Sequence, residues 1–272
     1  MPDWLSILLL GLIEGVTEFL PVSSTGHLLI AEQWLHPAVD KAHHELFNVV
    51  IQAGAMLAVL AVFSKRARDL VARSGEPATR DYLVKLISAF LITAVGGLLL
   101  KKVLHWELPK TAFPVAIATL VGGIVILGIE RGIRGRTTTQ YITWGVALTV
   151  GLAQVLAAAF PGTSRSGACI LFALTLGIAR PAATEFSFLV GIPTMFAASG
   201  LEIFGALRHG DRLTGSDWGS VALGSLVACG SAFLVVRWLL RFVQSNTFVL
   251  FGWYRIALGA GLLAMRQMGW IG

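Results

Sequence analysis

The sequence predicts an all-α integral membrane protein of about ten helices, with six full spans plus two re-entrant helix pairs in an inverted-topology repeat. Three observations support this fold class. Of the 272 residues, 56% are hydrophobic and only 13% are charged, whereas about a quarter of a soluble domain is charged. Several apolar stretches approach or reach the roughly 20 residues that a transmembrane helix needs. Two pairs of shorter apolar stretches are interrupted by polar turns that contain proline.

Charge and cysteine content limit the partners. The net charge is +6, but lysine and arginine beside membrane spans set topology and contact anionic head groups. We therefore predict membrane lipid, and no nucleic acid, as a partner. The first basic residue is Lys41, and Asp3 and Glu14 interrupt the N-terminal apolar run, so no cleaved signal peptide is expected. Cys169 and Cys229 lie in apolar runs and are predicted to be free thiols.

The expected elements follow one another as spans and broken pairs. Residues 4–20 and 24–35 form the first short pair, hinged at Pro21, and residues 141–160 and 164–178 form the second, hinged at Pro161. Proline ends a helix because it lacks an N–H and its ring clashes with the preceding turn. Full spans are expected at residues 45–63, 82–100, 112–129, 182–207, 218–240 and 247–265.

The two short pairs resemble each other at a constant offset of 140 residues. Between residues 11–24 and 151–164, Gly, Leu, Pro and Ser coincide, Glu14 aligns with Gln154, and Ser23 aligns with Thr163. We therefore expect a single membrane domain, residues 1–272, built from a first inverted repeat at 1–130 and a second at 140–268.

Positive charge predicts how the repeats are oriented. Basic residues are concentrated in the segments 64–81 and 130–140, which are expected to be loops, and this places both loops in the cytoplasm and both termini outside. Each half then has three full spans, and an odd number inverts the second half relative to the first. The two proline hinges would enter from opposite faces and meet near the midplane, where interrupted helices of repeated folds bind substrates.

The first hinge follows acidic residues that are unusual in an apolar segment. Glu14 and Glu18 are spaced i, i+4 and lie on one helical face. Each ionised carboxylate costs about 2.5–3.5 kcal/mol at the centre of a lone span. Two interpretations are open. The carboxylates serve as a metal ligand or general base in a wet cavity, or they form an ordinary pair at a helix end in water.

The residues after Pro21 suit an anion. Ser23 or Ser24 can cap the next helix, whose N-terminus presents free N–H groups and a partial positive charge. His27 lies one turn later and can approach a bound anion, although a structural hydrogen bond is the alternative. Gly26 allows close approach of the backbone.

The second hinge, P-G-T-S-R-S-G-A-C at residues 161–169, adds a second capped helix start and Arg165. The planar guanidinium binds phosphate oxygens bidentately, although it could instead only neutralise Glu18. Two helix N-termini, an arginine, hydroxyls, a histidine and two carboxylates are what hydrolysis of a phosphoanhydride needs, together with a divalent ion.

At these two hinges the chain resembles a known family. E-G-V-T-E-F-L-P-V-S-S-T-G-H at 14–27 and P-G-T-S-R-S-G at 161–167 are similar to the signature motifs of the undecaprenyl-diphosphate phosphatases of the bacitracin-resistance (UppP/BacA) family. The resemblance covers nearly the whole chain, including F-N-V-V-I-Q-A-G at 47–54 and E-F-S-F-L at 185–189. One departure is Cys169, where the family motif usually has Thr.

The resemblance implies an activity and a place for it. It implies hydrolysis of undecaprenyl diphosphate to the monophosphate, which recycles the lipid carrier of peptidoglycan synthesis and confers bacitracin resistance. It also implies a multi-pass protein of the bacterial inner membrane and a divalent cation, Mg²⁺ or Ca²⁺. The active site is predicted to open to the extracytoplasmic face, because the first hinge dips from that side.

Roles for single residues complete the hypothesis. The predicted catalytic residues are Glu18, Ser24, His27 and Arg165, and the predicted metal ligands are Glu14 and Glu18. His27 is the predicted base, which deprotonates either Ser24 or a water, and Ser24 is slightly favoured as the nucleophile. The predicted substrate-binding residues are Ser23, Thr25, Gly26, Thr163, Ser164, Ser166 and Gly167.

Two rival functions are weighed against hydrolysis. A lipid-phosphate transporter or flippase uses the same kind of inverted repeat, but paired carboxylates, serine and histidine exceed what anion binding requires. A phosphotransferase that consumes a nucleotide lacks any G-x-x-x-x-G-K-[ST] loop in this chain. The residues leave the oligomeric state open, a homodimer included.

Overall fold

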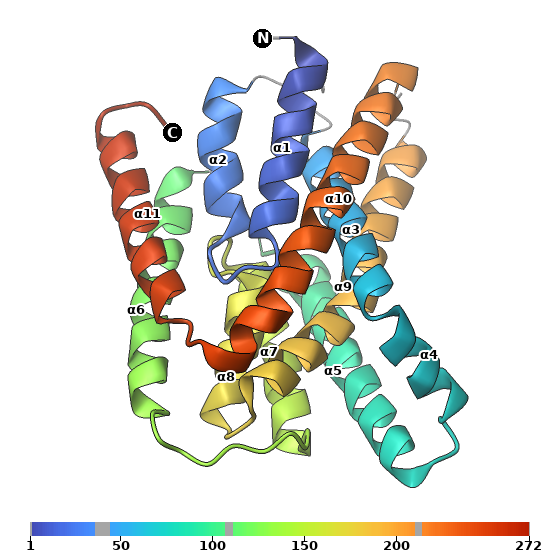
Figure 1. The fold of residues 1–272 in the computed structure, drawn as a ribbon. Helices are drawn as coiled ribbons and strands as arrows, with labels where there is room; N and C mark the ends of the chain where they lie inside the picture. Colours follow the sequence, from blue (N-terminus) through green and yellow to red (C-terminus); the bar gives the residue numbers. More distant parts are fainter. Residues whose placement is uncertain (1, 36–43, 107–110, 210–213, 272) are drawn as a thin grey trace.

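The computed structural model describes residues 2–35, 44–106, 111–209 and 214–271, which fold into eleven helices (Figure 1). These are α1 (Asp3–Thr17), α2 (Ser24–Trp34), α3 (His44–Val62), α4 (Ser64–Ala72), α5 (Pro77–Lys102), α6 (Ala112–Gly132), α7 (Trp144–Ala159), α8 (Arg165–Thr175), α9 (Arg180–His209), α10 (Gly215–Ser245) and α11 (Val249–Gln267). The described residues contain no strand, only an isolated bridge between Thr139 and Ile178. The predicted all-α fold class is confirmed.

Five of the described helices are long and apolar enough to cross a membrane. They are α5, α6, α9, α10 and α11, while α3 and α4 qualify only together, as a pair bent by 66°. Among the described residues, the six predicted spans are therefore present if the bent pair counts as one.

Helix α4 corrects one detail of the prediction, because segment 64–81 was expected to be only a loop. Lys65, Arg66 and Arg68 follow the end of α3, and Leu70 is the one residue of α4 that is buried. The chain bends where the charges begin, since ionised side chains are costly in hydrocarbon.

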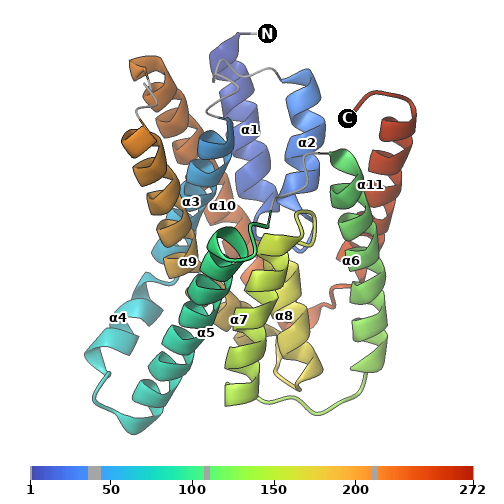
Figure 2. The same ribbon diagram turned by 180° about the vertical axis from the view of Figure 1, so that it is seen from behind.

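The helices of the two short pairs cannot cross a membrane individually. Helices α1, α2, α7 and α8 have 15, 11, 16 and 11 residues, which at 1.5 Å per residue is about 16–24 Å, against about 30 Å of hydrocarbon. Helices α1 and α2 lie in the half of the molecule that holds both termini, and α7 and α8 lie in the other half (Figures 1 and 2). Their turns meet between the two halves.

The first helix of each short pair packs on a long helix of the other predicted repeat. Helix α1 contacts α10, and α7 contacts α5. A Cβ at Gly11 would lie 2.6 Å from the carbonyl oxygen of Gly224, and one at Gly151 would lie 2.8 Å from that of Ala89. These glycines, 140 residues apart, permit the same close helix approach. Their equivalence supports the division into repeats 1–130 and 140–268, which stays a prediction.

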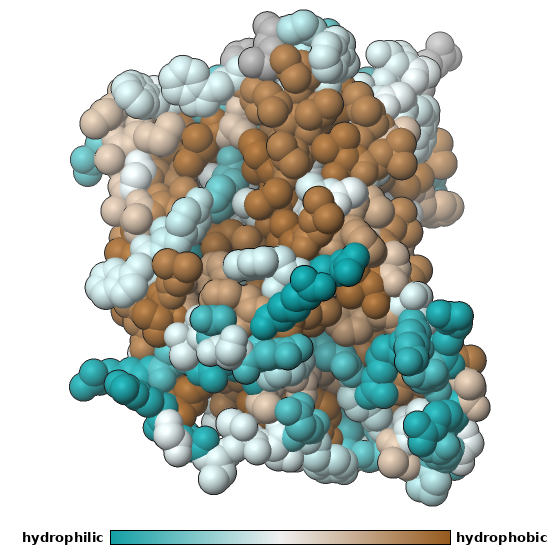
Figure 3. Space-filling view, in the orientation of Figure 1, coloured by the Kyte–Doolittle hydropathy of each residue, from teal (hydrophilic) through white to brown (hydrophobic). Residues whose placement is uncertain are grey.

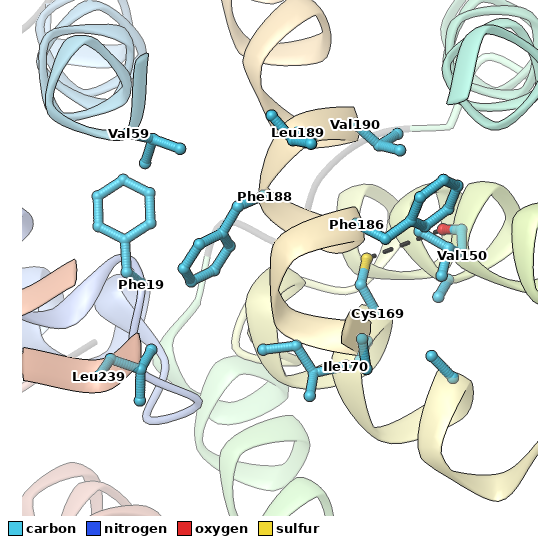
Figure 4. Packing of buried hydrophobic residues seen from close by; sticks show 14 of the residues in the cluster. Phe19, Val59, Val150, Cys169, Ile170, Phe186, Phe188, Leu189, Val190 and Leu239 are labelled. Atoms are coloured by element: carbon cyan, nitrogen blue, oxygen red, sulfur yellow. Dashed lines mark hydrogen bonds between the residues drawn. The ribbon is translucent and has the colours of Figure 1, made fainter. Parts of the chain in front are cut away.

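A hydrophobic cluster includes Phe19 of the first hinge and residues of α8, which follows the second (Figure 4). Phe19 of the first hinge packs edge-on against Phe188 of α9, with ring centroids 5.4 Å apart, and Phe188 also meets Phe63 at 6.5 Å. Cys169 and Ile170 of α8 belong to the same cluster. Rings and aliphatic side chains from distant segments therefore hold the hinges in place.

The ends of the molecule differ in polarity. In Figure 3, hydrophilic side chains gather toward the end away from the termini, below a band of hydrophobic side chains. Segments 64–81 and 130–140 both lie at that end (Figure 1). This arrangement agrees with the one that the charge pattern predicts.

Candidate active site

The first hinge is a tight turn between α1 and α2. Helix α1 ends where the Thr17 hydroxyl donates to the Ile13 carbonyl at 2.7 Å. Ser23 then adopts a positive φ of 73°, and its hydroxyl caps α2 by accepting from the Gly26 N–H at 3.3 Å. Of the two candidates for the cap, Ser23 is therefore the one used.

The second hinge repeats this construction. Ser164 has φ 65°, and its hydroxyl caps α8 by accepting from the Gly167 N–H at 3.2 Å. The capping serines are 141 residues apart, so the repeat slips by one residue relative to the offset of 140 that aligns Pro21 with Pro161. A non-glycine residue at such a φ costs on the order of 1–3 kcal/mol, and such residues cluster at functional sites.

Side chains of the second hinge bind the first. Arg165 Nη2 contacts Glu18 Oε1 at 2.5 Å. The Ser166 hydroxyl lies 3.1 Å from the Leu20 carbonyl oxygen and 3.2 Å from that of Glu18, and the Ser164 hydroxyl lies 3.5 Å from that of Leu20. The structure thus brings the two predicted motifs together, although 147 residues separate Glu18 from Arg165.

Glu18 links the candidate nucleophile to the candidate phosphate ligand. The Ser24 hydroxyl donates to Glu18 Oε2 at 2.7 Å, while Glu18 Oε1 faces Arg165. The side chains of Glu18 and Arg165 are 8% and 20% exposed, so the pair is largely shielded from solvent yet reachable. A carboxylate in this position can accept the proton of Ser24.

His27 is held differently from the expectation that it activates Ser24. Its Nδ1 lies 2.7 Å from the Ser23 carbonyl oxygen, which can only accept, so Nδ1 carries the hydrogen. Its Nε2 lies 2.7 Å from the Tyr254 hydroxyl, and the two rings stack with centroids 5.6 Å apart. In this geometry the Ser24 hydroxyl is hydrogen-bonded to Glu18 rather than to His27.

Glu14 is a buried carboxylate in the last turn of α1. It is fully enclosed, and neither carboxylate oxygen has a hydrogen-bond partner among the residues that the structure describes, while the charges of Glu18 and Arg165 act on it. Gln154, which the repeat aligns with Glu14, is likewise buried and unpaired at both polar atoms. An unpaired buried carboxylate beside a second one fits a cation or a shared proton.

The donor set allows one kind of metal site. Among the described residues, no three His, Cys, Asp or Glu side chains group closely enough to hold an ion by themselves. Mg²⁺ is often held by one or two carboxylates together with substrate phosphates. Glu14 and Glu18 fit that mode, and the divalent cation stays a prediction.

The thiol of Cys169 contacts α7. The residue is 1% exposed, and its thiol lies 3.8 Å from the Val150 carbonyl oxygen in α7 (Figure 4). Cys169, which stands where the family motif usually has Thr, therefore belongs to the packing between α7 and α8. We expect a thiol reagent to leave Cys169 unmodified with or without substrate.

The structure adds Tyr254 and Arg255 of α11 to the site. Tyr254 contacts His27, and Arg255 binds carbonyl groups of both hinges. Neither residue was predicted from the sequence. One signal could have identified Arg255, because an arginine within a predicted span (247–265) is costly in hydrocarbon and usually has a partner in the protein. The contacts themselves depend on how α11 packs.

Comparison with known proteins identifies a matching family and similar relatives. A family model described as Bacitracin resistance protein BacA matches residues 7–261. An undecaprenyl-diphosphatase of Rhizobium leguminosarum bv. trifolii (strain WSM2304) is 52% identical over 271 residues, covering 99% of this chain and 100% of the relative. An undecaprenyl-diphosphatase of Xylella fastidiosa (strain 9a5c) is 49% identical over 264 residues, covering 97% of this chain and 98% of the relative.

Proposed function

We propose that this chain, which belongs to the bacitracin resistance protein BacA family, hydrolyses undecaprenyl diphosphate to undecaprenyl phosphate and inorganic phosphate. The reaction regenerates a lipid carrier for peptidoglycan synthesis and confers bacitracin resistance. One observation carries the proposal: the carboxylate of Glu18 bridges the hydroxyl of Ser24 and the guanidinium of Arg165 where two helix N-termini meet. Hydroxyl, base and cationic group thus converge within a membrane protein.

Each group has a role that follows from its contacts. Ser24 Oγ attacks the terminal phosphorus and passes its proton to Glu18, and the bond from that phosphorus to the bridging oxygen breaks to release undecaprenyl phosphate. Water then cleaves the phosphoserine to give inorganic phosphate. Arg165 and the N–H groups at the starts of α2 and α8 stabilise the charge on the phosphoryl oxygens. His27 orients the turn at Ser23 through its carbonyl.

A divalent cation, Mg²⁺ or Ca²⁺, would be held by Glu14 and Glu18 and would offset charge on the diphosphate. We expect a chelator to lower the turnover of the purified protein roughly tenfold or more, and added Mg²⁺ or Ca²⁺ to restore it. Phosphate release would be measured before and after the addition. Full activity in excess chelator would rule out the cation, while Glu14 could still share a proton with Glu18.

The decisive experiment measures phosphate release by the purified protein in detergent. Farnesyl, geranylgeranyl and undecaprenyl diphosphates would be supplied with no membrane to cross. A hydrolase releases one phosphate per molecule and leaves the monophosphate, whereas a transporter or flippase leaves the diphosphate intact. Comparison of the three substrates also measures the preference for chain length.

We also propose that the protein resides in the bacterial inner membrane with segments 64–81 and 130–140 in the cytoplasm. Their basic residues support this orientation. The first hinge then dips from the extracytoplasmic side, and the active site opens there.

Cysteine labelling in intact cells tests this orientation. We expect a membrane-impermeant maleimide to label Met268→Cys, at the same end as the termini, and to leave Ala72→Cys unlabelled. Both positions should react once the cells are permeabilised. Labelling of residue 72 in intact cells would reverse the orientation.

A further inference from the structure

We propose that Arg255 of α11 is a positioning residue that holds the two hinges in register, so that Arg165 meets Glu18. In this role Arg255 does not bind the substrate and acts through the carbonyl groups of both turns. The proposal deepens the proposed function, because catalytic turnover is one of its readouts.

Arg255 is a buried charge that pairs with no carboxylate in the described part of the chain. It is 1% exposed, and none of the ion pairs between described residues includes it. A charge in the protein interior is expensive unless hydrogen bonds satisfy it. Its surroundings must therefore supply acceptors for the whole guanidinium group.

Five backbone carbonyl groups supply those acceptors. Nε contacts the oxygen of Thr119 at 3.1 Å, and Nη2 contacts that of Ala118 at 3.1 Å, both in α6. Nη2 also contacts Gly162 at 2.8 Å, while Nη1 contacts Thr163 at 2.9 Å and Pro21 at 3.5 Å. A guanidinium has five N–H groups, so this one has a separate carbonyl for each and no donor left for a phosphate.

These contacts flank the strained positions of the hinges. Pro21 lies two residues before Ser23, and Gly162 and Thr163 directly precede Ser164; both serines have positive φ. Such conformations persist only where the surrounding structure enforces them. Arg255 joins both turns to α6 and can enforce both at once.

The geometry of the peptide group extends this effect to the start of α8. No described peptide bond is cis, and in a planar trans peptide the N–H points opposite to the carbonyl. Because the Thr163 carbonyl points at Arg255, the N–H of Ser164 points away from it. Arg255 therefore also orients a backbone donor next to Arg165.

Gly122 provides the space that the guanidinium occupies. A Cβ at Gly122 of α6 would lie 2.1 Å from Arg255 Nη2 and 2.6 Å from its Cζ. The neighbouring Gly123 serves helix packing instead, since its Cβ would meet the Gly252 carbonyl oxygen of α11 at 2.6 Å. Gly122→Ala should thus displace Arg255 without changing its chemistry.

Arg165 and Arg255 differ in how many of their N–H groups already have a hydrogen-bond partner. Arg165 contacts one carboxylate, and its other N–H groups have no partner among the described residues, so it can grip phosphate. Arg255 has every donor engaged by backbone. Loss of Arg165 should therefore affect both KM and kcat, while loss of Arg255 should affect kcat alone.

The test compares Arg255→Lys and Gly122→Ala with Gly128→Ala. Gly128 lies on the same helix with nothing within 4 Å of its added Cβ. We expect kcat for phosphate release to fall about 100-fold in the first two variants, as for a misplacement near 1 Å, with KM within about twofold of wild type. Gly128→Ala should keep wild-type kcat. Wild-type kcat in both Arg255→Lys and Gly122→Ala would overturn the proposal, and so would failure of both to fold.

A double-mutant cycle separates positioning from a general structural role. In an Arg165→Ala background, Gly122→Ala should lower kcat by far less than in the wild type, because the aligned contact is already lost. Additive losses would show that Arg255 does not act through the hinge contact.

A distance measurement needs no turnover. Spin labels at Trp34→Cys in α2 and Leu176→Cys after α8, with Cys229 replaced by Ser, report the separation of the re-entrant pairs. We expect the distance distribution to broaden in Arg255→Lys and to stay narrow in Gly128→Ala. Unchanged distributions would contradict the proposal. Absence of phosphate release by the wild type would instead contradict the proposed function alone.

Discussion

Replacement of Ser24 by Ala is expected to lower kcat by on the order of 1,000-fold or more, with substrate affinity kept. The hydroxyl that donates to Glu18 at 2.7 Å would be lost, and with it the attacking oxygen. Because Ser23, not Ser24, caps α2, the substitution leaves the cap intact. Stability in detergent should therefore stay close to that of the wild type.

The measurement combines steady-state phosphate release with trapping of the intermediate. Rapid quenching of wild-type protein with radiolabelled substrate should yield a phosphoserine at residue 24. Ser199→Ala is the matched control, since it removes a buried hydroxyl bonded to the Val49 carbonyl at 2.8 Å, away from the hinges. Ser24→Ala protein that folds and keeps a tenth or more of wild-type kcat would exclude Ser24 as nucleophile.

Arg165→Lys is expected to lose most activity although the charge is kept. An ammonium group cannot face Glu18 and bind two phosphate oxygens with the planar geometry of a guanidinium. The expected loss in kcat/KM corresponds to about 2–5 kcal/mol, as for the truncation of one partner of a buried charge pair.

Arg180→Lys is the matched control for this substitution. Arg180 pairs with Glu130, and its side chain is 27% exposed compared with 20% for Arg165. The Arg180→Lys variant should keep its turnover, and any loss should be confined to the stability of the folded protein. Near-wild-type kcat/KM in Arg165→Lys would refute the bidentate grip on phosphate.

The elements of the fold follow from the sequence because bilayer thickness sets how long an apolar helix must be. Proline and the apolar lengths predicted both broken pairs, and the motifs predicted the residues that meet at the hinges. Helix α4 was missed because its charged residues read as a loop. Its helical form rests on local hydrogen bonds and on burial of Leu70.

Partners of individual side chains were less predictable. His27 was expected to reach Ser24, but the stacked ring of Tyr254, 227 residues away, holds it instead. Ser164 and Ser166 were expected to bind substrate, and here they hold carbonyl groups of the first hinge. Their substrate contacts, like those of Thr25 and Gly167, stay predictions. Such choices depend on packing between distant helices, which spacing along the chain does not reveal.

The place of Arg255 in α11 has a consequence for biosynthesis. A nascent chain enters the membrane from its N-terminus, so Glu18 and Ser24 are inserted early and Arg165 much later. The guanidinium that binds Pro21, Gly162 and Thr163 arrives only with the last helix described. Under the proposals for Ser24, Arg165 and Arg255, a partly synthesised chain would have the groups that react with phosphate but lack the one that aligns them. Hydrolysis would begin only when insertion of the final helix is complete.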